Sequence, residues 1–355
     1  MPDRDLSWHR AQAMALDMGG VRKALQGRLK RGDFRAAILY LEHQYQLAPT
    51  PDAALQLGQM HMRCRSYPAG LWHLQQAIKR WPDDLALVRL AAEMAMLAQD
   101  FTSAAPLWHK IIAQKNAQGP YPVLRAIACL RQTGQARHAD DVITRHATVL
   151  RHSMERAGVQ MLRRGADRLP RGLYLVSGNN GTGKSTLGHL LHALGYPIID
   201  ADTEIASFCL HRHFSDVRHD LRRRSPESDA LIRWAWPDSR VTERFAKARK
   251  RREAVFVIGG FGKTVVPYRD RFRQIFHLCA PDHVIADRLA ARSSINHKPG
   301  SKGYQAALQR NSREQQPDYA ATILSADRPP WAICAELLSA IDRTPANQSR
   351  ALERT

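Results

Sequence analysis

The stretch SGNNGTGKST at 177–186 has the residue types and the spacing of a loop that binds the phosphates of a nucleotide. Gly178 and Gly183 allow backbone conformations that other residues resist, so successive amide N–H groups can point inward at a phosphate. Lys184 would reach the β- and γ-phosphates, and the Ser185 hydroxyl would bind Mg²⁺. The residues predicted to bind the nucleotide are Gly178, Asn179, Asn180, Gly181, Thr182, Gly183, Lys184, Ser185 and Thr186.

A glycine-rich loop alone is weak evidence, and its flanks decide the interpretation. The apolar run LYLVSG at 173–178 is typical of a buried strand, and KSTLGHLLHALG at 184–195 is typical of an amphipathic helix. Gly195 would end that helix, whose N-terminus adds the positive end of its dipole to the loop. Strand, loop and helix therefore follow in the order that phosphate binding requires.

Two aspartates follow the loop. The segment YPIIDADTEIA at 196–206 is predicted to be a second strand that ends in Asp200 and Asp202. Two carboxylates two residues apart at a strand end share one side and face the phosphates. One could hold Mg²⁺ through water, and the other could accept the proton of an attacking hydroxyl. The alternative is that either aspartate caps a helix beginning near Thr203.

Strands and helices alternate through the rest of the C-terminal half. AVFVIGGFG at 254–262 is typical of a buried strand that runs into glycines without an acidic residue, which leaves the magnesium to Asp200. A further strand and a helix carrying Arg288 and Arg292 follow at 274–292, and then come a basic stretch with a helix, a strand and a last helix. This alternation predicts a three-layer α/β P-loop NTPase domain with a parallel sheet.

A repeat fills the first half of the chain. The segments RGDFRAA, RSYPAG, AQDFTSAA and GQARHAD recur at nearly fixed spacing. In the clearest unit, residues 51–84, Gly58 and Gly70 would let two helices approach closely. Residues 18–150 resemble the tetratricopeptide repeat, whose period is about 34 residues. The small residue of that repeat is Ala37, Gly70, Ala104 and Ala139 in the four units.

Such an all-α array is stable only when several repeats stack, and its concave side usually holds a peptide or another protein. We therefore expect a protein or peptide partner on the repeats. The alternative is a helical scaffold that docks on the C-terminal domain of the same chain.

Residues 171–343 resemble the shikimate kinase branch of small P-loop kinases, which includes gluconate kinase-like proteins. The segments that carry the resemblance are GNNGTGKST, IIDADTEI, VIGGFG, CAPDHVIADRL, HKPGS and PDYAATILSAD. The resemblance implies that Lys184 and Ser185 hold ATP and Mg²⁺. It also implies that Asp202 is the base at the substrate hydroxyl and that Asp200 lies near the metal.

The same resemblance assigns roles outside the loop. Gly259 and Gly260 would line the substrate pocket, and Arg288 would stack on adenine opposite the ADRPP segment. Lys298 stands where the family's lid has an arginine that stabilises the moving phosphoryl group, and Arg292 would add to the neutralisation of charge.

The chain departs from the family where the acceptor would bind. Gln315 replaces the family's substrate-binding arginine, with Arg313 nearby as a substitute. The family's acceptor region gives way to residues 211–240, in which Trp234 and Trp236 could stack on a sugar or base or pack on the sheet. We therefore expect the acceptor to be a hydroxyl compound other than shikimate.

The formal net charge of +20 is divided equally between the two halves of the chain. It is compatible with acidic partners such as nucleotides, sugar phosphates, nucleic acid or an anionic surface, although solvated arginine-rich faces are the favoured explanation. The N-terminus lacks the unbroken apolar segment of a secretory signal, and no apolar run is long enough to span a membrane.

Neither the cysteines nor the clustered histidines have the spacing of metal ligands. The cysteines are Cys64, Cys129, Cys209, Cys279 and Cys334. They are far apart, which predicts reduced thiols in a cytoplasmic protein. His211, His213 and His219 are predicted to be loop or substrate-region residues.

The sequence thus predicts a multidomain chain with an all-α tetratricopeptide-like array before an α/β domain. The predicted parts are an N-terminal segment 1–17, repeats 18–150, a helical linker 151–170, a kinase-like domain 171–343 and a tail 344–355. The predicted activity is transfer of the γ-phosphoryl group of Mg-ATP to a small hydroxyl compound. Alternatives are a nucleotide-binding adaptor or regulator whose repeats bind a protein, and, third, a protein acting on nucleic acid.

Overall fold

The computed structural model describes residues 34–114, 119–210, 232–251, 253–260, 262–291, 299–313 and 317–342. The chain divides into two compact units. Within the described residues, the first unit holds helices α3 to α7 and the strands β3 and β4, and the second holds the other helices and a five-stranded sheet.

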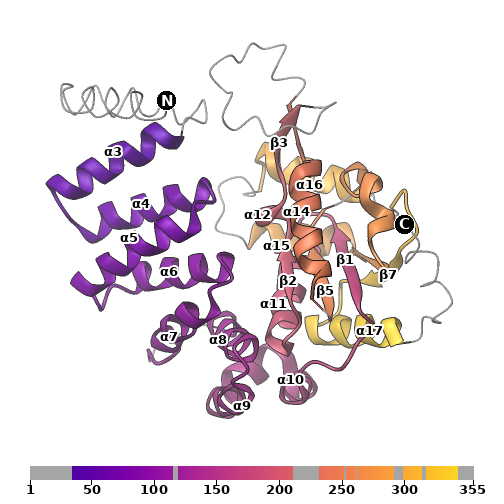
Figure 1. The fold of residues 1–355 in the computed structure, drawn as a ribbon. Helices are drawn as coiled ribbons and strands as arrows, with labels where there is room; N and C mark the ends of the chain where they lie inside the picture. The colour runs from indigo at the N-terminus through magenta and orange to yellow at the C-terminus, as the bar shows by residue number, and fades with distance from the viewer. Residues whose placement is uncertain are drawn as a thin grey trace. The chain divides into compact units, whose positions relative to one another are not determined.

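The first unit is built from helices that pack in sequence (Figure 1). Its helices are α3 (Phe34–Leu47), α4 (Pro51–Arg63), α5 (Tyr67–Arg80), α6 (Leu85–Leu97) and α7 (Phe101–Ile112). The side chains of Thr50, Asp84 and Asp100 accept backbone N–H groups at the starts of α4, α6 and α7. β3 (Ser207–Leu210) and β4 (Ile232–Ala235) form an antiparallel pair.

Small residues bring α4 and α5 together, as the repeat pattern predicts. A Cβ atom built on Gly58 would lie 2.8 Å from Leu74 Cδ2, so only glycine fits without displacing that leucine. The tetratricopeptide assignment itself stays a prediction, since paired helices alone do not define that repeat.

The sheet of the second unit is entirely parallel, with the strand order β2-β5-β1-β6-β7. Its strands are β1 (Gly172–Gly178), β2 (Ile198–Asp200), β5 (Ala254–Ile258), β6 (Gln274–Cys279) and β7 (Thr322–Ser325). The helices are α8 (Tyr121–Gln132), α9 (Ala136–Arg145), α10 (Ala147–Arg164), α11 (Lys184–Leu194), α12 (Ala201–Glu204), α14 (Asp238–Arg249), α15 (Asp282–Ala290), α16 (Lys302–Arg313) and α17 (Pro330–Asp342), with 3-10 turns η3 (Gly262–Thr264) and η4 (Val266–Arg271).

Successive side chains of a strand point to opposite faces, and both faces of this sheet are covered. Leu173 and Leu175 of β1 share one buried cluster with Phe245 of α14. On the other face, α11 approaches so closely that a Cβ on Gly188 would lie 3.0 Å from Ile258 Cγ1. The predicted fold class, helices followed by a layered α/β domain with a parallel sheet, is confirmed.

The compact units divide at residue 118, whereas the sequence places the start of the α/β domain near residue 171. Helices α8 to α10 group with the sheet, and α8 bonds directly to the end of α11. Arg131 of α8 donates to the carbonyl oxygen of Ala193 at 2.7 Å, and Gln132 donates to that of Gly195 at 2.9 Å. These bonds satisfy carbonyls that the C-terminal end of α11 leaves without a helical partner.

The helical segment that precedes the sheet is interrupted. α9 ends at Arg145, and α10 contains a non-helical residue, Glu155, with φ 57° and ψ −178°. None of the helices in the described ranges is both long and apolar enough to traverse a bilayer.

Candidate functional site: a phosphate-binding loop at the sheet edge

The glycine-rich loop follows β1, the central strand of the sheet, and leads directly into α11. Gly178 has φ 142°, and a Cβ there would lie 2.6 Å from the carbonyl oxygen of Leu278. Because that neighbour is backbone, no side chain can be accommodated without moving a strand. The Thr182 hydroxyl donates to the Asn179 carbonyl at 2.8 Å and closes the loop.

Lys184 begins α11 and is buried against the loop. Its ammonium donates to the carbonyl oxygens of Gly178 at 2.6 Å and Asn179 at 2.9 Å. The hydroxyl-bearing residues Ser185 and Thr186 are exposed in the same first helical turn. The loop therefore combines a fixed cation with a helix N-terminus and two accessible hydroxyl residues, a set that suits a phosphate with its metal ion.

Asp200 and Asp202 do not share one side of a strand, because β2 ends at Asp200 and α12 begins at Ala201. The Asp200 carboxylate accepts the backbone N–H groups of Asp202 at 3.1 Å and Thr203 at 3.3 Å, which makes it the cap of α12. Burial, and then the negative charge of Asp202, raise the pKa of Asp200. The cap, considered above as the alternative, is thus what the structure shows for Asp200.

Asp202 is exposed and lies over Gly259. A Cβ on Gly259 would be 3.1 Å from Asp202 Oδ1, and the residue has φ 126°. The Gly259 N–H donates to Val176 O at 3.0 Å, and the Gly178 N–H approaches Gly260 O at 3.4 Å. The two glycines after β5 therefore stand between Asp202 and the start of the phosphate-binding loop.

Gly260 is covered by Trp236. A Cβ on Gly260 would lie 2.6 Å from Trp236 Cζ2, and the indole is 1% exposed. Tyr268 stacks on Trp236 at 6.0 Å between ring centroids, and its hydroxyl donates to Trp236 O at 2.7 Å. Trp236 is therefore buried against Gly260, which agrees with the prediction that it packs on the sheet, and its ring has no exposed face for a ligand.

Arg288 lies beside the loop. A Cβ on Gly183 would be 4.0 Å from Arg288 Nη1. Arg288 is also close enough to act on Asp327, which follows β7. The pKa of Asp327 is lowered mainly by a hydrogen bond from Ser325, and the positive charges of Arg328 and Arg288 lower it further. Arg288 thus lies near the loop and near the segment after β7, and its stacking on adenine stays a prediction.

Sequence reasoning missed two buried polar groups near the loop. Glu204 Oε1 accepts the Asp200 N–H at 3.0 Å, and burial raises the pKa of Glu204 to about 7 although the charge of Arg244 opposes the shift. Behind the loop, Ser177 Oγ lies 2.9 Å from His277 Nδ1 and accepts the Tyr319 hydroxyl at 3.1 Å. For Ser177 and His277 the signal was a polar residue within an apolar run, LYLVSG and QIFHLC respectively, which periodicity alone does not interpret.

Several predicted site residues cannot be located. Arg292, Lys298 and Gln315 lie outside the described residues, as do His211, His213 and His219. Arg313 is the last residue of α16, and Trp234 lies in β4, but the described residues do not include their side chains. The carbonyl of Arg310 is 3.4 Å from Asn179 Nδ2, which brings α16 to the loop.

Comparison with known proteins gives a family model and structural neighbours. A model described as an AAA domain matches residues 175–317, which include the loop and both aspartates. No curated protein sequence matches the chain. The chain is similar to a gluconokinase from Sinorhizobium meliloti 1021, with 23% identity, 52% of this chain and 98% of that chain covered, and a TM-score of 0.32. It is also similar to a sugar kinase from Janibacter sp. HTCC2649, with 22% identity, 50% and 98% covered, and a TM-score of 0.31.

Proposed function

We propose that residues 171–343 transfer the γ-phosphoryl group of Mg-ATP to a hydroxyl group of a small molecule. The observation that carries this proposal is the exposed carboxylate of Asp202 against Gly259, on the sheet edge where the loop of Lys184 begins. A carboxylate at this edge can accept the proton of a hydroxyl while the cation neutralises the transferred group.

The residues fit a nucleotide phosphate. Gly178 and Gly183 have the positive φ angles that turn amides toward one point, and the Lys184 ammonium donates to two carbonyl oxygens of the loop. Ser185 would bind Mg²⁺ directly, and Asp200 would bind it through water. The bound ion would neutralise the negative charge of the phosphates. Arg288 would bind adenine, and Lys298, Arg292 and Arg313 would stabilise the phosphoryl group or the acceptor.

The acceptor is proposed to be a sugar, sugar acid, polyol or nucleoside. Trp236 fills the space over Gly260, so the acceptor would approach from the Asp202 side. The segment 207–253, where the sequence departs from the family, would supply the remaining contacts.

The test is ADP release measured over a panel of these acceptors. Lys184→Ala and Asp202→Asn should each lower acceptor-stimulated release at least about a hundredfold. The matched control is Asp270→Asn, since the side chain of Asp270 is 87% exposed. Equal ADP release by Asp202→Asn and Asp270→Asn would show that Asp202 is not the base. If no acceptor on the panel stimulates ADP release, the proposed kinase activity is refuted.

A second candidate function is a nucleotide-dependent regulator whose helices bind a partner protein. It is favoured by the bonds from Arg131 and Gln132 of α8 to the end of α11, the helix that begins in the phosphate-binding loop. Nucleotide-dependent hydrogen exchange in α8, together with no turnover on the acceptor panel, would support this function. Unchanged exchange in α8 on nucleotide binding would exclude it.

We also propose a reducing, cytoplasmic setting. Among the residues that the structure describes, Cys64, Cys129, Cys279 and Cys334 are not joined in disulfides. Alkylation of the denatured protein, without a reductant, should modify every cysteine, as measured by mass spectrometry.

A further inference from the structure

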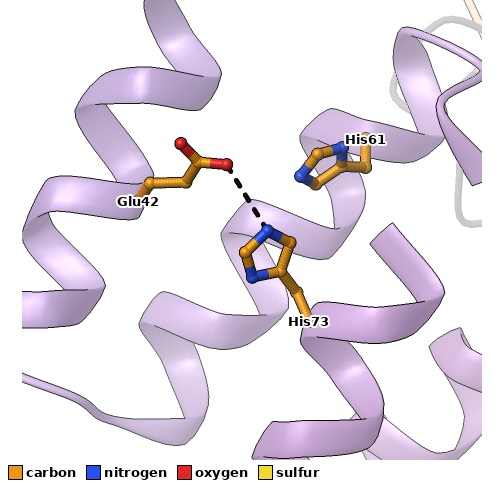
Figure 2. Close-up of side chains that lie close together, drawn as sticks. All are labelled: Glu42, His61 and His73. Atoms are coloured by element: carbon orange, nitrogen blue, oxygen red, sulfur yellow. Dashed lines mark ion pairs between the residues drawn. The ribbon is translucent and has the colours of Figure 1, made fainter. Parts of the chain in front are cut away.

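Three side chains from successive helices of the first unit point toward one another (Figure 2). Glu42 comes from α3, His61 from α4 and His73 from α5. His73 Nε2 lies 3.4 Å from Glu42 Oε1, and the two imidazole rings stack with centroids 5.2 Å apart. One ligand atom from each residue lies within 4.8 Å of the other two.

His61 is the member that needs an explanation. It is 4% exposed, and within the described part of the chain neither ring nitrogen has a hydrogen-bond partner. A buried polar group without a partner is unfavourable, and such groups are rare in folded proteins. A neutral imidazole keeps a lone pair on one ring nitrogen that can bind a metal ion.

The repeat departs from its own pattern at the residue that makes room for this histidine. Where the other units carry Ala37, Ala104 and Ala139, the second unit has Gly70. A Cβ on Gly70 would lie 2.5 Å from His61 Cβ. The glycine therefore lets α5 approach the helix turn that carries His61.

We propose that Glu42, His61 and His73 bind a divalent first-row transition-metal ion, with Zn²⁺ as the chemistry of best fit. Two imidazole nitrogens and a carboxylate oxygen are a common ligand set of zinc, with bonds of about 2.0–2.2 Å. In tetrahedral geometry such bonds place ligand atoms about 3.3 Å apart. The His73–Glu42 pair already has this spacing, and the most distant pair would need to approach by at most about 1.5 Å.

The site is also reachable. The side chains of His73 and Glu42 are 23% and 28% exposed, so an ion can enter from solvent and keep a water molecule as its fourth ligand. The bound ion would join α3, α4 and α5 by bonds to the metal. This inference does not depend on the proposed kinase activity, because the two involve different residues.

The experiment uses Co²⁺ as a spectroscopic probe on the full chain, with Zn²⁺ as competitor. Wild type should bind one Co²⁺ tightly, with visible absorption that one equivalent of Zn²⁺ removes. Glu42→Gln, His73→Gln and His61→Leu should each weaken binding at least about tenfold. The matched control, His43→Gln on α3, should bind as wild type does, because His43 is outside the cluster.

Two outcomes would overturn the proposal: no visible Co²⁺ absorption by wild type, or equal affinity in wild type and the three ligand variants. The second outcome would show binding by other histidines, since the chain has 14 besides His61 and His73 (16 − 2). His61→Leu keeps the test decisive if a polar variant fails to fold, since it replaces a buried ring without hydrogen bonds by an apolar side chain.

Discussion

Two histidines on α11 should make the second unit sensitive to acid. His189 lies edge-to-face on Tyr121 of α8 at 4.8 Å, and His192 is 7% exposed. Burial, and then the positive charge of Arg125, lower the pKa of each to about 3. Between about pH 6.5 and pH 3, both rings are therefore neutral in the folded protein, whereas they are protonated in the unfolded chain.

The direction of the pH dependence of stability follows from proton uptake by the unfolded chain. The unfolded histidine has a pKa of about 6.5, so between pH 6.5 and 3 the unfolded state binds protons that the folded state does not, and stability falls as pH falls. At pH 5 each histidine should cost about 2 kcal/mol relative to pH 8. Glu204, with its pKa raised to about 7, acts in the opposite direction, because its stabilising protonated form is lost as pH rises.

A difference measurement isolates His192 from Glu204. We expect the fall in the free energy of unfolding from pH 8 to pH 5 to be about 2 kcal/mol smaller in His192→Leu than in wild type. Chemical denaturation at both pH values measures it, with His152→Leu as the control because His152 is exposed on α10. The reasoning is refuted if His192→Leu shifts stability by the same amount at both pH values.

Three further substitutions test the packing of the site. Gly178→Ala should weaken nucleotide binding at least about tenfold in a titration, because its Cβ meets the backbone oxygen of Leu278 at 2.6 Å. Gly260→Ala should destabilise the protein by about 1–3 kcal/mol in urea unfolding, because its Cβ would press on a buried indole at 2.6 Å; an unchanged midpoint would contradict this. Arg131→Met should cost about 2 kcal/mol and lower the thermal midpoint, because the end of α11 loses a charged donor.

The layered α/β fold could be predicted because its signals are local. The loop needs glycines at fixed positions between an apolar run and an amphipathic segment, and these requirements are written in consecutive residues. The same is true of the helix pairs, whose small residues Gly58 and Gly70 mark close contacts.

The site was less predictable because its details depend on where elements end. Asp200 and Asp202 would share a side only if β2 continued to Asp202, and the strand stops two residues before it. The role of Arg131 depends on carbonyls at the end of a helix far along the sequence, which no local pattern contains. His61 fits the apolar face of its helix by spacing, so its missing partners became visible only with α3 and α5 beside it.

The bonds from α8 to α11 bear on how the chain can be divided. A fragment cut at the apparent boundary near residue 170 would lose Arg131 and Gln132 and leave the last carbonyls of α11 to water. It would also uncover the side of α11 that holds two uncharged imidazoles. A fragment that keeps both the phosphate-binding loop and the helices bonded to α11 therefore has to begin at residue 119. The last helices of the predicted repeat region are thus part of the same compact unit as the nucleotide site.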